Sequence, residues 1–207
     1  MNDSFKNRQE AGRLLAEEIR RRYPDLDNGI VLALPRGGVV VGEKIAKDLG
    51  YLLDIVVTRK IGAPGNPEYA IGAVSANTIV LGKESVDKQY LDKAIKKERQ
   101  EIRRRIIKYC GNRTVRQLKG KNILLVDDGL ATGLTMMAAI KEIRRQKPNK
   151  IILAVPVAPP KTTDDIKKIV DDVIVLKIES LFFAVGQFYT DFSEVSDQEV
   201  IKYLKDF

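Results

Sequence analysis

Residues 123–135 read Ile-Leu-Leu-Val-Asp-Asp-Gly-Leu-Ala-Thr-Gly-Leu-Thr, and this stretch decides the fold that we expect for the chain. The apolar run from Ile123 to Val126 is typical of a strand buried on both faces, as strands are in parallel sheets. Two carboxylates follow it, those of Asp127 and Asp128. After the loop, apolar residues recur at helical spacing: Met136, Met137, Ile140 and Ile143. The stretch therefore predicts a strand, an acidic pair, a loop of small residues and a helix.

The loop has features that suit a phosphorylated sugar. Gly129 and Gly133 allow an anion to approach the backbone, whose N–H groups point toward it where a helix begins. Thr132 and Thr135 add hydroxyl donors. The acidic pair can accept hydrogen bonds from sugar hydroxyls, or hold Mg2+ through water. A ribose 5′-phosphate would bind both parts of the loop, its phosphate to the donors and its hydroxyls to the acidic pair. The alternative is an ordinary strand-to-helix turn with solvated aspartates.

From Val126 to Thr135 the chain resembles the phosphoribosyl diphosphate (PRPP) motif of type I phosphoribosyltransferases. Over nearly its whole length it is similar to a family of bacterial and archaeal phosphoribosyltransferases of unsettled substrate, notably at 34–38, 59–68 and 188–193. The resemblance implies an α/β fold, with a mainly parallel central sheet flanked by helices and a small C-terminal hood. It also implies one domain over 1–207, with a core at about 25–178 and a hood at about 179–207 that includes the N-terminal segment.

The pattern of strands and helices along the chain leads to the same fold class. Helices are predicted at 4–23, 39–49, 85–109, 136–146, 162–170 and 196–207, the last with a capping box formed by Ser196 and Glu199. Strands are predicted at 30–34, 53–58, 69–74, 78–81, 123–126, 151–157 and 173–178. Residues 111–120 are expected to be a polar link. Because ligands bind at the carboxyl ends of such strands, the loops at 35, 59 and 127 are expected to share one cleft.

The resemblance assigns the PRPP site residue by residue. The residues expected to bind PRPP are Arg36, Gly37, Gly38, Asp127, Asp128, Gly129, Leu130, Ala131, Thr132, Gly133, Leu134 and Thr135. Asp127 and Asp128 are expected to fix the ribose and to hold Mg2+, the expected cofactor, through water. In related enzymes the loop at Arg36 often contains a non-proline cis peptide, so we expect one near Arg36–Gly37. A glycine turn that carries a surface arginine is the alternative for this loop.

The segment from Arg59 to Glu68 is broken by glycine and proline after two adjacent cations. It resembles the mobile catalytic loop of the family, in which Arg59 and Lys60 would meet the leaving diphosphate. A plain surface loop is the alternative. The residues expected to be catalytic are therefore Arg59, Lys60, Asp127 and Asp128.

Five of the thirteen aromatic residues lie between 181 and 192, in the segment that the resemblance assigns to the acceptor-binding hood. We expect Val157, Phe188 and Tyr189 to contact a base-like acceptor, while most of these aromatic rings are expected to be packing residues. Hypoxanthine-type relatives carry an aspartate general base where this chain has Ala131. The loop therefore resembles the adenine- and orotate-type version, and the chain has no histidine that could replace the base.

Composition narrows the classes of function. With no histidine and one cysteine, Cys110, the sequence excludes Ser-His and Cys-His mechanisms, an intramolecular disulfide and a cysteine zinc site. The polar first ten residues and the lack of a long apolar run predict a cytoplasmic protein without a membrane span. The net charge of +8 fits nucleic acid or an anionic substrate. We favour the solvated face of a long helix for the basic run at 93–108, so nucleic acid is not an expected partner. We separately expect the protein to form a homodimer.

These observations predict transfer of 5-phosphoribose from PRPP to a nucleobase-like acceptor, with release of diphosphate, in purine or pyrimidine salvage. Two alternatives stay open. One is a PRPP-sensing regulator without turnover, and the other is a binding module for another phosphorylated ligand.

Overall fold

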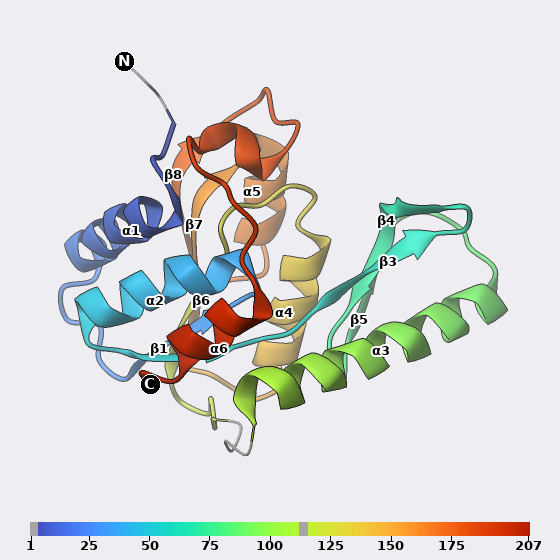
Figure 1. Ribbon diagram of the computed structural model, residues 1–207, viewed down its shortest axis with the longest axis horizontal. Coiled ribbons are helices and arrows are strands. Elements are labelled where there is room, and N and C mark those ends of the chain that lie inside the picture. Colours follow the sequence, from blue (N-terminus) through green and yellow to red (C-terminus); the bar gives the residue numbers. More distant parts are fainter. Residues whose placement is uncertain (1–3, 112–115) are drawn as a thin grey trace.

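The computed structural model describes residues 4–111 and 116–207. A five-stranded parallel sheet forms its centre, in the order β2-β1-β6-β7-β8 (Figure 1). Its strands are β1 (Gly29–Ala33), β2 (Leu52–Ile55), β6 (Asn122–Val126), β7 (Lys150–Ala158) and β8 (Asp172–Ile178). In-register parallel pairing of β6 with both β1 and β7 confirms the predicted α/β fold with a parallel sheet.

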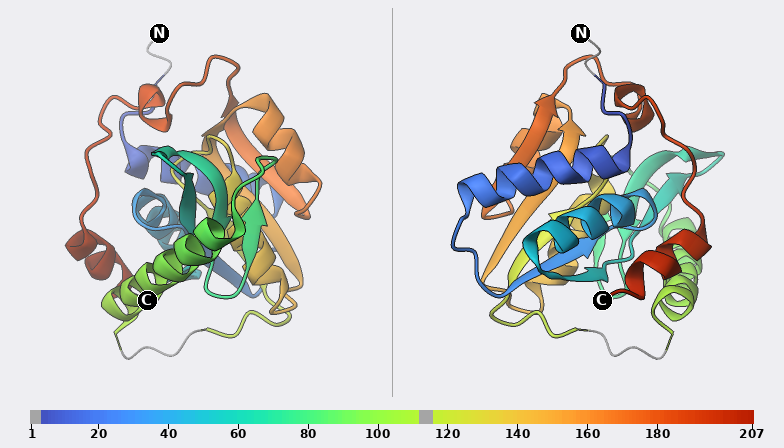
Figure 2. Two further views of the ribbon diagram at one scale, coloured as in Figure 1. Left: turned by 90° about the vertical axis from the view of Figure 1, so that its right-hand side faces the viewer. Right: turned by 60° about the vertical axis from the view of Figure 1, so that its left-hand side comes forward.

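Helices cover both faces of this sheet, which is why the strands at its centre, β1, β6 and β7, are mainly apolar. One face carries α1 (Arg8–Arg22) and α2 (Gly37–Leu49), and the other carries α4 (Leu134–Arg144) and α5 (Pro160–Lys167) (Figure 2). Alternate residues of β6 serve the two sides: Leu124 packs in the cluster with α1 and α2, and Leu125 in the cluster with α4. The expectation that this strand is buried on both faces is therefore confirmed.

A second, three-stranded antiparallel sheet extends from one edge of the molecule (Figure 1). Its strands are β3 (Arg59–Ala63), β4 (Asn66–Val74) and β5 (Ile79–Leu81), and we call them the flap. The long helix α3 (Lys88–Cys110) packs along the flap, where the Tyr90 hydroxyl donates to the Gly62 carbonyl at 2.8 Å. The hairpin predicted at 69–81 is confirmed by the pairing of β4 with β5.

The irregular loop predicted for 59–68 was wrong, because this segment is the β3–β4 hairpin. The glycine and proline breaks that suggested a loop are accommodated by two register shifts around Gly62 and by a turn at Gly65, which has a φ of +76°. A Cβ on Gly62 would lie 2.5 Å from the Pro67 carbonyl oxygen, so glycine permits the close approach of the two strands there.

Several element boundaries differ from the prediction. α1 begins at Arg8 rather than at Ser4, because the Asn7 side chain caps it by accepting from the Glu10 N–H. α2 begins two residues early, at Gly37, and α3 begins at Lys88 after an Asp87 cap. β2 ends at Ile55, and the chain then leaves for the flap. The polar link predicted at 111–120 lies partly outside the described residues.

The N-terminal segment and the first part of the hood, around the short 3-10 helix η1 (Val185–Phe188), lie together at one end of the molecule, whereas α6 (Asp197–Leu204) lies near the opposite end (Figure 2). The Phe5 N–H donates to the Phe188 carbonyl and the Thr190 N–H to the Phe5 carbonyl, both at 2.8 Å. Along the chain, η1 precedes this contact and α6 follows it. Within the part of the chain that the structure describes, no helix is long and apolar enough to cross a membrane.

The capping box of α6 is present as predicted: the Ser196 hydroxyl accepts from the Glu199 N–H, and Glu199 accepts from the Ser196 N–H. We expect Ser196→Ala to lower the free energy of unfolding by about 1 kcal/mol, because an N-cap side chain satisfies an otherwise unpaired helix donor. Urea unfolding of the two proteins measures this difference. Ser85→Ala, at an exposed serine before α3, is the matched control. Equal losses in both variants would contradict the capping role.

Candidate functional site

The loop between β6 and α4 forms a cup of backbone donors. Gly133 has a φ of +76° and is the N-cap of α4, so the chain turns sharply into the helix. The Leu130 N–H donates to the Val157 carbonyl at 2.9 Å, and the Met137 N–H donates to Gly133. Between them, within the described residues, the N–H groups of 131–135 have no protein acceptor. Such a run at a helix N-terminus is suited to an anion with several oxygens.

Two glycines bring the first turn of α2, which follows β1, directly against the acidic pair. A Cβ on Gly37 would lie 1.9 Å from Oδ2 of Asp128, and a Cβ on Gly38 would lie 2.9 Å from Oδ1 of Asp127. Neither space could hold a side chain without moving a carboxylate. Two stretches that the sequence predicted separately, at 36–38 and 127–135, are thus one site.

The peptide bond between Pro35 and Arg36 is cis, close to the position expected for such a bond. The Arg36 side chain points to the C-terminal segment, where its guanidinium pairs with Glu194 and lies 3.8 Å from Asp197. Glu194 is largely exposed, with 79% of its side chain accessible, so this pair is a solvent-screened contact that a diphosphate could replace.

Asp128 is held by contacts from three segments of the chain. Its Oδ2 accepts from Nε of Arg8 at 2.7 Å, and its backbone carbonyl accepts from the Tyr189 hydroxyl at 2.7 Å. Its own N–H donates to Oδ1 of Asp127 at 2.9 Å. Burial raises the pKa of the Tyr189 phenol, so this hydroxyl remains a donor at neutral pH. The carboxylate of Asp128 is therefore fixed by a residue near the N-terminus, and its backbone by a residue near the C-terminus.

Asp127 lies deeper in the site. Burial is the main cause that raises the pKa of its carboxyl well above the usual value, and the neighbouring charge of Asp128 raises it further. The described residues contain no cluster of three or more acidic, cysteine or histidine side chains that could hold a metal. The acidic pair does fit Mg2+, because this ion is commonly bound by one or two carboxylates together with substrate phosphates and water.

The two cations of the flap point in different directions. Nε of Arg59 lies 2.8 Å from Oε2 of Glu98 on α3, in an ion pair. Because side chains alternate along a strand, Lys60 projects from the flap face opposite to α3 and is exposed. This geometry favours Lys60 over Arg59 as the flap residue that could meet a substrate.

The residues predicted to contact the base-like acceptor lie close to the cup, but their side chains mainly pack against other residues of the protein. Val157 is fully buried, and its side chain lies against Gly129, where an added Cβ would meet it at 3.1 Å. The Tyr189 ring packs against Phe5 and Phe192, with centroid distances of 5.5 and 5.0 Å. Phe188 pairs with Phe182 and is more exposed than Tyr189.

Sequence reasoning missed Arg8, which contacts the acidic pair from 120 residues away in the chain. A signal was present, because Arg8 shares one face of α1 with the buried residues Ala11, Leu15 and Ile19. A charged residue on the apolar stripe of a helix is rarely buried unless it is paired. The stripe could therefore have predicted a buried partner, although not its identity.

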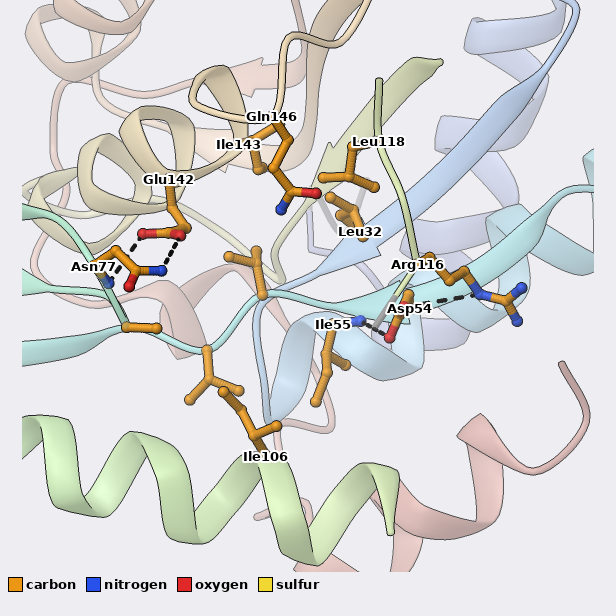
Figure 3. Close-up of a pocket in the computed structure, with 13 residues that line it drawn as sticks. Leu32, Asp54, Ile55, Asn77, Ile106, Arg116, Leu118, Glu142, Ile143 and Gln146 are labelled. Atoms are coloured by element: carbon orange, nitrogen blue, oxygen red, sulfur yellow. Dashed lines mark hydrogen bonds and ion pairs between the residues drawn. The ribbon is translucent and has the colours of Figure 1, made fainter. Parts of the chain in front are cut away.

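A separate cavity of about 230 Å³ lies where the flap, α3 and the far end of α4 meet the parallel sheet (Figure 3). Polar residues line its two ends and already contact protein groups: Asn77 donates to Glu142, and Arg116 lies 3.7 Å from Asp54. The cup is at the opposite end of α4, which at 1.5 Å per residue is about 16 Å long. Residues 127–135 do not line this cavity.

Comparison with known proteins shows the family to which this chain belongs. Residues 2–193 match the family described as "Phosphoribosyl transferase domain", so the chain belongs to the phosphoribosyltransferase domain family. A Mycobacterium tuberculosis protein named "Putative phosphoribosyl transferase Rv0571c" is 38% identical over 206 residues. The match covers 97% of this chain and 46% of that protein, so the chain spans about half the length of this curated relative.

Solved structures show the same fold. The crystal structure of the protein TT1426 from Thermus thermophilus is 40% identical, covers 98% of both chains and superposes with a TM-score of 0.83. A purine phosphoribosyltransferase from Pyrococcus horikoshii shares 16% identity over 95% of this chain and 99% of its own, with a TM-score of 0.50. This second likeness concerns the fold alone.

The buried Asp127 leads to a stability prediction. Its pKa is raised in the folded protein, so stability that is fully present below the unfolded pKa of about 4 is lost as the pH rises and the buried carboxyl ionises. Asp127→Asn removes this cost and keeps the acceptor for the Asp128 N–H. We expect the ligand-free variant to unfold at a higher temperature than the wild type at pH 8, with a smaller gain near pH 5.

Calorimetric unfolding at the two pH values measures the gain. Asp92→Asn, at an exposed position of α3, is the control and should show no pH-dependent gain. A lower unfolding temperature for Asp127→Asn at pH 8 would show that the ionised carboxylate stabilises the fold.

Proposed function

We propose that the protein transfers 5-phosphoribose from PRPP to a nucleobase-like acceptor and releases diphosphate. The observation that carries this proposal is the run of unpartnered N–H groups at 131–135, set directly beside the carboxylates of Asp127 and Asp128. An anion cradle next to hydroxyl acceptors suits a ribose that carries a 5′-phosphate. We also propose a single domain over 1–207 that acts as a homodimer in the cytoplasm, in nucleotide salvage.

Each part of the site has a role in this proposal. The cup holds the 5′-phosphate, and the acidic pair fixes the ribose hydroxyls, so the reacting carbon C1 is oriented by two sets of contacts. Arg36 and Lys60 supply positive charge for the leaving diphosphate. When bound at Asp127 and Asp128 through water, Mg2+ would supply further charge neutralisation.

Among the described residues, those of the site include no histidine and no aspartate within the loop at 129–135 that could act as a general base. Ala131 occupies the loop position where hypoxanthine-type relatives carry an aspartate, and the chain has no histidine. The proposal therefore places any proton transfer on the acceptor itself or on water. An acceptor that loses its proton readily suits this site better than one that needs a strong base.

A PRPP-sensing regulator without turnover is the second candidate, and the surface of α3 favours it. Lys93, Lys96, Lys97 and Arg103 are exposed on this helix and form no ion pair within the described residues. Such a face could contact a polyanion such as nucleic acid. The site favours the enzyme, because a sensor needs no flap lysine on the side of the leaving group.

The decisive experiment incubates the protein with PRPP, Mg2+ and single purine or pyrimidine bases and measures diphosphate release. Release that depends on one base would support the transferase and identify its acceptor. PRPP binding by calorimetry without any base-dependent release would favour the sensor. The matched control is Asp127→Asn combined with Asp128→Asn, which is expected to abolish PRPP binding because both carboxylate charges, which strengthen the hydrogen bonds to the ribose hydroxyls and attract Mg2+, are removed. If this variant still binds PRPP with the affinity of the wild type, the acidic pair does not contribute to PRPP binding.

The flap lysine gives a second test. We expect Lys60→Ala to lower kcat about 10- to 100-fold while PRPP affinity changes less, because charge on the leaving group develops mainly in the transition state. Steady-state kinetics with the identified acceptor, together with calorimetry, separates the two effects. Lys202→Ala, at an exposed lysine of α6, serves as the control. An unchanged kcat in Lys60→Ala would show that this flap residue takes no part in catalysis.

A further inference from the structure

The guanidinium of Arg8 is enclosed by the protein and makes two hydrogen bonds within it. Nε donates to Oδ2 of Asp128 at 2.7 Å, and Nη1 donates to the Ser193 carbonyl at 2.8 Å. One face of the guanidinium lies 3.8 Å from the centroid of the Phe192 ring. Only 10% of the side chain is accessible. Little of this cation is left to reach a bound substrate, so any effect on a ligand must pass through its partners.

Its main partner is the carboxylate that the proposed site needs in a fixed position. Asp128 stands beside a second carboxyl group, that of Asp127, whose Oδ1 accepts from the Asp128 N–H at 2.9 Å. The buried guanidinium of Arg8 lies 2.7 Å from Oδ2 of Asp128 and fixes the position of this carboxylate through an ion pair. A carboxylate has two oxygens with about four acceptor sites, so a contact of Oδ2 with Arg8 leaves capacity for a sugar hydroxyl.

The contact also links three distant parts of the chain. Arg8 lies in the first turn of α1, Asp128 lies at the end of β6, and Ser193 and Phe192 belong to the C-terminal segment. Gly37 completes the cluster, because its missing Cβ would lie 2.8 Å from Nε of Arg8. The N-terminal helix thus bears directly on the proposed ribose site, although no motif of the chain includes it.

We infer that Arg8 is a positioning residue, which orients the Asp128 carboxylate for the ribose hydroxyls of PRPP. This inference rests on the proposed function. Contacts that orient the groups of a ligand site from behind are commonly worth about 10- to 100-fold in affinity or activity. Arg8 would then contribute to PRPP binding without touching PRPP.

Three variants of the full chain test the inference. Arg8→Gln removes the charge, Arg8→Lys keeps a charge near Asp128 but cannot also hold Ser193, and Arg13→Gln is the control on an exposed position of α1. PRPP affinity is measured by calorimetry with Mg2+, and the unfolding temperature is measured without ligand. We expect Arg8→Gln to bind PRPP about 10- to 100-fold more weakly, and Arg8→Lys to recover most of this loss. Both should lose thermal stability to a similar extent.

The comparison of the two Arg8 variants separates positioning from mere packing. If their affinities fall equally, in step with their unfolding temperatures, Arg8 is a structural residue and the inference is overturned. Unchanged affinity in Arg8→Gln overturns it as well. If Arg8→Gln does not fold, Arg8→Met replaces it, because methionine keeps an unbranched stem against Phe192 while it removes the charge. A wild-type protein that does not bind PRPP would overturn the proposed function itself, and the inference with it.

Discussion

The contact between the first turn of α2 and the acidic pair that follows β6 is the constraint on which the site depends. It exists because two positions lack a Cβ: any side chain on Gly37 or Gly38 would overlap the carboxylate of its neighbour. The parallel pairing of β1 with β6 brings the two loops to the same edge of the sheet. The anion cradle, the carboxylates and Arg36 are consequently close in space, although they belong to separate strand–loop–helix units of the chain.

The polar groups of Asp128, next to this contact, are paired with residues that lie outside the parallel sheet. The carboxylate of Asp128 is neutralised by a helix at one end of the chain, and its backbone is held by a tyrosine near the other end. Burial of charge is tolerated only with such partners, since an unpaired buried carboxylate is strongly disfavoured. The segment that packs over the cup is therefore built from both termini, and its rings serve mainly to pack around Arg8 and Tyr189.

The flap shows how the same residue types can carry different structures. Glycine and proline at 62–67 are as compatible with a bulged hairpin as with an open loop, and local pattern does not distinguish them. The difference is made by α3, whose apolar stripe covers one face of the flap and whose Glu98 holds Arg59. The strand alternation that follows leaves Lys60 on the other face, which changes which cation the site can use.

The sequence by itself determined the α/β fold, the buried strand at 123–126, the helix after it and the cup between them, because these features depend on local apolar periodicity and on glycine placement. It also predicted the capping box at Ser196 and Glu199. Only the tertiary structure decided the partners of the charged groups: Arg8 with Asp128, Arg36 with Glu194 and Arg59 with Glu98. The first two pairs join residues 120 and 158 positions apart, and no periodic pattern records contacts that long-range packing creates.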